Sequence, residues 1–279
     1  MSLRRFAFVS VFAAVVLGVA AVTLEIDIKL NDAAAETGVA GAEALSPAGP
    51  TSLPGSPALS DELDPIALLY NMSNEIAKLD RFIVTGEAYV DARLAEGQII
   101  EHASKVTVRV KRPSSMRMTN QTSEGLKEIY FNAGVLTVST QPQNYYAQAE
   151  IPEGIGAAAE FATRELGIDA PLIDLLMKNV SENLSKDARS IDYLGTSLIR
   201  DAIYNHIGIR GPEIDLQIWI PVDGPALPAK MVMTSKWEAG SPRFVAFLNW
   251  EVNPEIKADS FEFTPPEGAI KIQFLHDSQ

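Results

Sequence analysis

Residues 214–252 read IDLQIWIPVDGPALPAKMVMTSKWEAGSPRFVAFLNWEV, and this stretch decides the fold. Its apolar residues recur at every second position in three runs, and a period of two residues is typical of a half-buried β-strand. The two breaks carry turn residues, with Asp223-Gly224 in the first and Gly240 in the second. The stretch therefore predicts an antiparallel meander of three strands with one continuously apolar face.

Outward from this meander, the same alternation predicts a large sheet, and helical periodicity predicts three helices. Asp64 followed by Pro65 is typical of a helix N-cap and first helical position. The predicted helices cover residues 65–79, 155–166 and 171–180. Six other predicted strands cover residues 82–94, 98–111, 114–120, 126–132, 135–140 and 144–149. The strand pattern begins again near Ile191 and continues through residues 199–209 into the meander. Residues 261–264 and 269–274 are predicted to close the edge of the sheet.

The N-terminal part has the order of an export signal. A short basic start precedes residues 6–24, which carry no charge. This run approaches the length of a membrane span, so residues 1–32 are either a cleaved signal, cut near Ala20 or Ala35, or an uncleaved anchor. Residues 33–60 are rich in Ala, Gly, Pro and Ser, which predicts a flexible linker before a domain over residues 61–279. We expect a periplasmic protein, tethered to the inner membrane if the segment is retained.

Composition argues against several classes of function. The net charge of −13 disfavours nucleic acid as a partner. The chain has no cysteine, and its three histidines show no metal-ligand spacing. A nucleophile elbow and a phosphate-binding glycine loop are also missing from the sequence. We therefore expect a protein that is not an enzyme and uses no cofactor or metal.

The segment 66–147 resembles the LolA and LolB family of lipoprotein carriers. The resemblance rests on a helix leading into long strands, the Lys111-Arg112-Pro113 turn, and the strands and hairpin over residues 116–147. The later pieces PLIDLL (171–176), LPAKMVMT (227–234) and FEFTPPEGA (261–269) resemble predicted periplasmic proteins of unknown function with that fold. The sequence departs from the family in having Ala133-Gly134 where relatives carry an Asp-Gly turn.

The resemblance implies an α+β fold. It consists of a curved antiparallel sheet, an incomplete β-barrel of about ten or eleven strands, with helices that plug or cover its concave face. By the same analogy, Arg112 matches a carrier arginine associated with ligand handling and release. The apolar face of the sheet is then either an ordinary hydrophobic core, filled by the helices, or a wall that binds acyl chains.

Methionine and tryptophan favour the binding wall, because thioethers adapt to varied apolar ligands. The candidate ligand-binding residues are Arg112, Met116, Met118, Tyr130, Ile218, Met231, Met233, Trp237, Leu248 and Trp250. The leading hypothesis is a periplasmic carrier or receptor for a lipid, a lipoprotein acyl chain or another apolar ligand. The alternative is a membrane-tethered sensing or interaction module of the same fold that binds an envelope protein.

Overall fold

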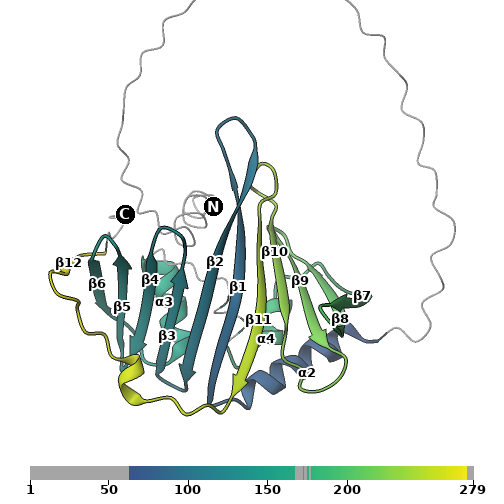
Figure 1. Ribbon diagram of the computed structural model, residues 1–279. Helices are drawn as coiled ribbons and strands as arrows, with labels where there is room; N and C mark the ends of the chain where they lie inside the picture. The colour runs from purple at the N-terminus through teal and green to yellow at the C-terminus, as the bar shows by residue number, and fades with distance from the viewer. Residues whose placement is uncertain (1–62, 167–171, 173–174, 176, 275–279) are drawn as a thin grey trace, which may run out of the picture. The chain divides into compact units, whose positions relative to one another are not determined.

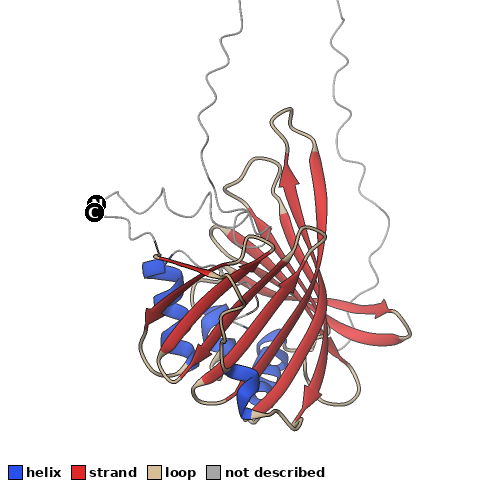
Figure 2. Cartoon of the chain, turned by 60° about the vertical axis from the view of Figure 1, so that its left-hand side comes forward, coloured by secondary structure: helices blue, strands red, loops and turns tan. Residues whose placement is uncertain are grey.

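A computed structural model describes residues 63–166, 172, 175 and 177–274, which form one curved sheet with helices on its concave face (Figures 1 and 2). The predicted signal or anchor and the predicted linker lie outside the described residues. The helical elements are α2 (Pro65–Ala77), α3 (Ile155–Leu166), α4 (Val180–Ser185) and the 3₁₀ turn η2 (Ala258–Phe261). The strands are β1 (Arg81–Arg93), β2 (Ile99–Lys111), β3 (Ser115–Gln121), β4 (Leu126–Asn132), β5 (Val135–Gln141), β6 (Tyr145–Glu150), β7 (Ser190–Ile199), β8 (Ala202–Arg210), β9 (Ile214–Pro221), β10 (Lys230–Ser235), β11 (Arg243–Val252) and β12 (Ile270–Ile272).

Helix α2 begins where its capping sequence predicts. The Asp64 carboxylate accepts a hydrogen bond from the Ile66 amide at 2.9 Å, and Pro65 occupies the first helical position. The helix buries Leu69, Met72 and Ile76. These residues are spaced three and four apart, so they lie on the helix face that packs against the sheet.

The sheet has the strand order β12-β6-β5-β4-β3-β2-β1-β11-β10-β9-β8-β7. Two meanders, β1–β6 and β7–β11, therefore meet where β1 pairs with β11 in antiparallel register. Gly86 lies at this junction, where a Cβ atom would come within 2.3 Å of the Phe247 carbonyl oxygen. Only glycine allows the two backbones to approach so closely. The two ends of the sheet, β12 and β7, do not pair with each other, so the barrel stays open as predicted.

The connection from β6 to β7 runs between opposite ends of the sheet and carries α3 and α4 (Figure 1). Helix α3 has the predicted bounds, 155–166. Of the predicted helix 171–180, residues 171, 173, 174 and 176 lie outside the described residues, and residues 177–179 form a bend and a turn instead of a helix. In the part that is described, α4 begins at Val180, where the predicted helix ends.

The C-terminal part differs from the prediction in two ways. Residues 262–264 form no strand, and β12 pairs with β6 in parallel register, so the sheet has twelve strands, one of them parallel. Residues 254–269 instead cross the convex face of β3–β6 as a strap before reaching β12 (Figure 1, yellow). Residues 262–264 cannot pair within the sheet because they lie over its face, where Phe263 packs against side chains from β4 and β6.

Candidate functional site

The candidate site is the concave face of the sheet, which we call the inner wall. It is built from every second residue of the long strands, such as Val106, Val108 and Val110 of β2. Cross-strand register continues this surface, because Met231 lies opposite Ile218 on one side and Ala246 on the other. Strand alternation thus gathers residues far apart in sequence into one apolar surface.

Methionine is concentrated between the inner wall and its helices. Of the seven methionines in the chain, Met1 lies outside the described residues, and the other six belong to the core cluster or pack against it. They are Met72, Met116, Met118, Met177, Met231 and Met233. Flexible, polarisable thioethers fill irregular gaps and accommodate ligands of varied shape.

Helix α3 covers the wall with small side chains. Its fully buried residues are Ile155, Ala158, Ala159 and Ala162, and the partly buried Phe161 and Leu166 also pack against the core. The Ile155 amide donates to the Pro113 carbonyl at 3.0 Å, which fixes the start of α3 beside β3. Alanine removes little apolar area from water, so this helix is held to the wall more weakly than a leucine-rich helix would be.

Seven of the predicted residues lie on the inner wall. Trp250 packs against Phe82 with ring centroids 5.6 Å apart, and its indole Nε1 donates to the Pro228 carbonyl at 2.8 Å. The full set on the wall is Met116, Met118, Ile218, Met231, Met233, Leu248 and Trp250. The structure therefore brings most of the predicted residues onto one face, as a shared strand period requires.

The structure places Tyr130 on the opposite, convex face of the sheet, so it does not join this surface. Its ring packs against Phe263 of the strap at 5.4 Å, and the Arg117 guanidinium lies 4.8 Å from its centroid. Burial there raises the pKa of Tyr130 to about 12. Trp237 lies in the bend after β10 and is partly exposed, outside the core cluster.

Arg112 lies at the C-terminal end of α2. Its Nε donates to the Leu79 carbonyl at 2.8 Å, and Nη2 donates to the Ile76 carbonyl at 3.4 Å. The guanidinium also lies 5.3 Å from the Phe82 ring centroid, and burial lowers its pKa. A cation here satisfies carbonyl groups that a helix leaves without intrahelical donors. Arg112 thereby links α2 to the base of β1 and β2.

Lys127 is an inward-facing residue that our sequence analysis missed. It alternates with Ile129 and Phe131 along β4, and it lies opposite Asn120 on β3 and Thr140 on β5. Burial lowers the pKa of Lys127 to about 8. The sequence did contain the information needed to find Lys127, because the strand period of two puts residues 127, 129 and 131 on one face. The inner wall is therefore polar where Lys127, Asn120 and Thr140 lie side by side, and we call this part its polar end.

The described residues hold no group of three His, Asp or Glu side chains able to bind a metal ion. Within the same residues, no helix combines the length and the apolar character needed to span a bilayer. The arrangement that remains is an apolar wall with a polar end and a helical cover.

Comparison with known proteins identifies relatives of this architecture. A family model described as "Predicted periplasmic protein (DUF2092)" matches residues 66–275. This match confirms the predicted similarity to periplasmic proteins of that description. Comparison with curated proteins gives no match.

Solved structures with low sequence identity also resemble the chain. The lipoprotein LppX from Mycobacterium tuberculosis is 12% identical, with 70% of this chain and 98% of that chain covered and a TM-score of 0.42. A LolA superfamily protein from Nitrosomonas europaea is 13% identical, with 71% and 96% covered and a TM-score of 0.36. LprF from Mycobacterium bovis is 13% identical, with 74% and 97% covered and a TM-score of 0.41.

Proposed function

The chain belongs to the DUF2092 family of predicted periplasmic proteins, and from this premise we propose that it is a periplasmic, non-enzymatic carrier or receptor for an apolar ligand. The ligand is a lipid or a lipoprotein acyl chain, held between the inner wall and the helices.

The observation that carries this proposal is the gathering of six methionines between one sheet face and its cover. A core that serves stability alone gains from side chains with few rotamers, whereas methionine is flexible and specifies packing poorly. An adaptable apolar surface suits a ligand with many conformers, such as an acyl chain. Each methylene that leaves water contributes about 0.8 kcal/mol to its binding.

The inner wall is closed in the structure, so a ligand has to displace part of the cover. Met116 is 3% exposed and Met231 is 1% exposed. Helix α3 is the part most readily displaced, because three of its four fully buried residues are alanine. The ligand replaces the contacts that α3 gives up, and the polar end at Lys127 suits the head group of an amphiphile.

Native mass spectrometry of the exported full chain tests the proposal directly. We expect a fraction of the molecules to carry a co-purifying lipid and the remainder to bind a fluorescent fatty acid. Apo protein throughout, with no fatty-acid binding, would contradict the proposal.

Substitution at Met233 separates a binding wall from an ordinary core. Met233 is only partly buried, so Met233→Asp should abolish fatty-acid binding while a cooperative thermal melt remains, because a ligand cannot cover an unpaired charge without a large desolvation cost. Thr234→Asp is the matched control, since the adjacent residue of β10 faces the other side of the sheet. Unfolding of Met233→Asp, together with unchanged binding in the milder Met233→Ala, would assign this position to the core.

A further inference from the structure

A row of aromatic and charged residues crosses the convex face on the side of the sheet away from the strap. In cross-strand register, Glu87 of β1 lies opposite Phe247 of β11, which lies opposite Lys230 of β10. Lys230 lies opposite Trp219 of β9, which lies opposite His206 of β8. We call Phe247, Lys230, Trp219 and His206 the outer aromatic row. Because these residues are direct cross-strand neighbours, their side chains touch.

The contacts within the row are close and face-on. The Lys230 ammonium lies 4.4 Å from the Trp219 ring centroid and 5.1 Å from that of Phe247. His206 stacks on Trp219 with centroids 4.1 Å apart and an interplanar angle of 14°. The Arg200 guanidinium, from the β7–β8 turn, lies 5.8 Å from the Phe247 centroid. Two cations thus lie over aromatic faces, an arrangement that is stronger when water is excluded.

The row carries positive charge without a carboxylate partner among the described residues. Ion pairs between described side chains include neither Lys230 nor Arg200. Burial, with a further contribution from Arg243, lowers the pKa of Lys230. Glu87, at the end of the row, accepts a hydrogen bond from the Tyr89 hydroxyl at 3.1 Å. An incoming carboxylate would therefore meet cations that are crowded and partly desolvated.

The other half of the convex face shows what such a surface receives. There Tyr130, Tyr146 and Arg117 also bring aromatic rings and a cation together, with the difference that Arg117 is paired with Glu128 at 2.7 Å. The strap inserts Phe263 between the two tyrosines, at 5.4 and 5.2 Å, and the Ser260 carbonyl accepts from Arg117 at 3.4 Å. The chain thus covers one aromatic and basic surface with an extended, phenylalanine-bearing segment of its own.

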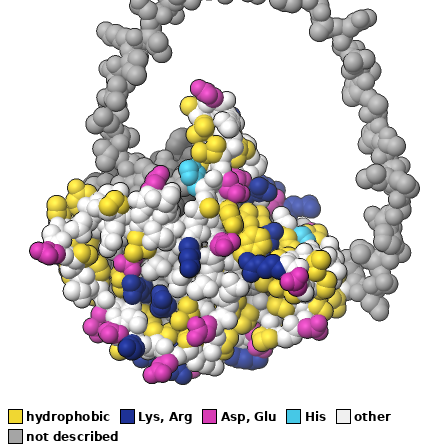
Figure 3. All heavy atoms as spheres, in the orientation of Figure 1, with side chains coloured by type: hydrophobic (Ala, Val, Ile, Leu, Met, Phe, Trp, Pro, Cys, Tyr) yellow, Lys and Arg dark blue, Asp and Glu magenta, His cyan; other side chains and the backbone are white. Residues whose placement is uncertain are grey.

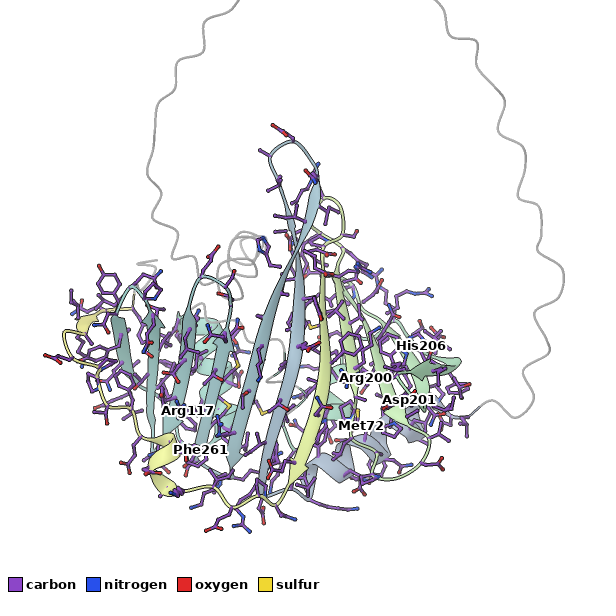
Figure 4. The ribbon with its side chains drawn as sticks, viewed as in Figure 1. Met72, Arg117, Arg200, Asp201, His206 and Phe261 are labelled. Carbon is purple, nitrogen blue, oxygen red and sulfur yellow. The ribbon has the colours of Figure 1, made fainter. Side chains whose placement is uncertain are left out.

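Figure 4 shows the two halves in one view, with Arg117 and Phe261 on one side and Arg200 and His206 on the other. In Figure 3, hydrophobic side chains lie at the surface on this face, over β9–β11, with both basic and acidic side chains at their border. The strap's packing partners belong to β3, β4 and β6, which leaves the outer aromatic row to another occupant.

We infer that the outer aromatic row is the docking surface for an extended, acidic segment of a partner protein that carries an aromatic side chain. Trp219 is only 6% exposed because Lys230 and His206 cover it, so the incoming aromatic ring packs against the half-buried Phe247 and His206, and a carboxylate reaches Lys230 and Arg200. The linker predicted over residues 33–60 of this chain contains no aromatic residue, so it does not supply this chemistry. This surface is on the opposite side of the sheet from the proposed ligand wall and does not depend on it.

A peptide with the sequence of residues 257–267, KADSFEFTPPE, is a suitable probe, because the strap already contacts a similar surface. We expect the full chain to bind the fluorescein-labelled peptide and to bind a version with both phenylalanines replaced by serine far more weakly. Lys230→Glu should weaken peptide binding about tenfold or more, because it reverses the central charge. Lys111→Glu, the same charge change on an exposed residue of β2, should alter affinity by less than about twofold.

Two controls keep the test decisive. Arg200→Asp changes an exposed turn residue, so it serves if Lys230→Glu disturbs folding, and thermal melts of each variant report the fold. Equal peptide affinity in Lys230→Glu and the unchanged chain would assign binding to the strap site and overturn the inference. No binding up to about 1 mM peptide would also overturn it. A different result would assign the row to a membrane surface instead. In that case the peptide does not bind, and vesicles of anionic phosphatidylglycerol bind the unchanged chain but not Lys230→Glu.

Discussion

The backbone of Ala133 is in the left-handed region, with φ of 47°, and Gly134 follows with φ of 80°. Positive φ at both central residues of a two-residue loop is the type I′ turn that suits the twist of a hairpin. The β4–β5 hairpin therefore keeps the geometry of an Asp-Gly turn, although Ala133 replaces the aspartate. An alanine in this conformation is strained, because its Cβ approaches the following carbonyl.

Replacing Ala133 should therefore stabilise the domain. Ala133→Asn creates an Asn-Gly turn and should raise the free energy of unfolding by about 1 kcal/mol. Ala133→Val should lower it, because a β-branched residue tolerates positive φ poorly. Urea denaturation measures both changes, and equal stability of the two variants would mean that the turn carries no strain.

Lys127 should make stability depend on pH in the alkaline range. Its pKa of about 8 in the folded chain is below the ordinary lysine value of about 10.4. Below both values lysine is charged in the folded and unfolded chain, and the cost of burying the charge is present in full. As pH rises through the folded pKa, the folded chain loses its proton first and becomes more stable.

The Lys127→Met variant isolates this effect. The unchanged chain should gain stability between about pH 8 and pH 10, and Lys127→Met should lack that gain and be more stable at pH 7. Chemical denaturation across this range measures the difference. Parallel curves for the two proteins would show that Lys127 titrates normally.

At the scale of elements, α2 and α3 cover the same face but are held differently. Helix α2 buries Leu69, Met72 and Ile76, and Arg112 binds carbonyl groups at its C-terminal end. Three of the four fully buried residues of helix α3 are alanine, and Phe161 and Leu166 are only partly buried. The larger apolar area under α2 makes it part of the stable core, and α3 is the element suited to move.

A pair of glycine substitutions tests this difference. Ala157 and Ala67 are exposed and are each the third residue of their helix. Glycine at either site costs about 0.5–1 kcal/mol of helix stability without removing a buried contact. If α3 opens for the ligand, Ala157→Gly should tighten fatty-acid binding about two- to fivefold, and Ala67→Gly should leave it unchanged. Fluorescence titration measures both, and equal affinities would show that α3 does not move.

At the scale of the whole described domain, both free ends of the sheet are modified. At one end β12 covers β6, and at the other the register of β7 shifts between Tyr193 and Thr196. A covered or irregular edge resists pairing with another sheet. The strap that carries β12 is held across the convex face by Phe263, between Tyr130 and Tyr146.

Phe263→Ala should release β12 without unfolding the sheet. We expect faster amide hydrogen exchange over residues 270–272, unchanged exchange in β1, and a loss of about 1–2 kcal/mol of stability. Thr264→Ala, at the adjacent exposed residue, is the control. Unchanged exchange in β12 would mean that its hydrogen bonds to β6 hold the strap without Phe263.

Most strands, the start of α2 and the bounds of α3 were predictable from sequence, because period, capping and turn chemistry act between residues a few positions apart. The resemblance to a known family supplied the curvature of the sheet and the helices on its concave face. Prediction succeeded less well where several consecutive residues are buried. In β4, Ile129, Tyr130 and Phe131 are all buried, so alternation does not show that Tyr130 faces outward. In β9, by contrast, the period of two places Trp219 on the face opposite Ile218 and Ile220, although all three are buried.

The sequence by itself determined the local elements and the apolar character of the inner wall. Only the tertiary structure decided that β1 joins β11, that Arg112 binds the end of α2 and that the strap covers Tyr130. Each of these contacts joins residues far apart in sequence or depends on which face of a strand is buried. Such contacts form only when the whole chain packs around one core, so they cannot be predicted from the periodicity of a short segment.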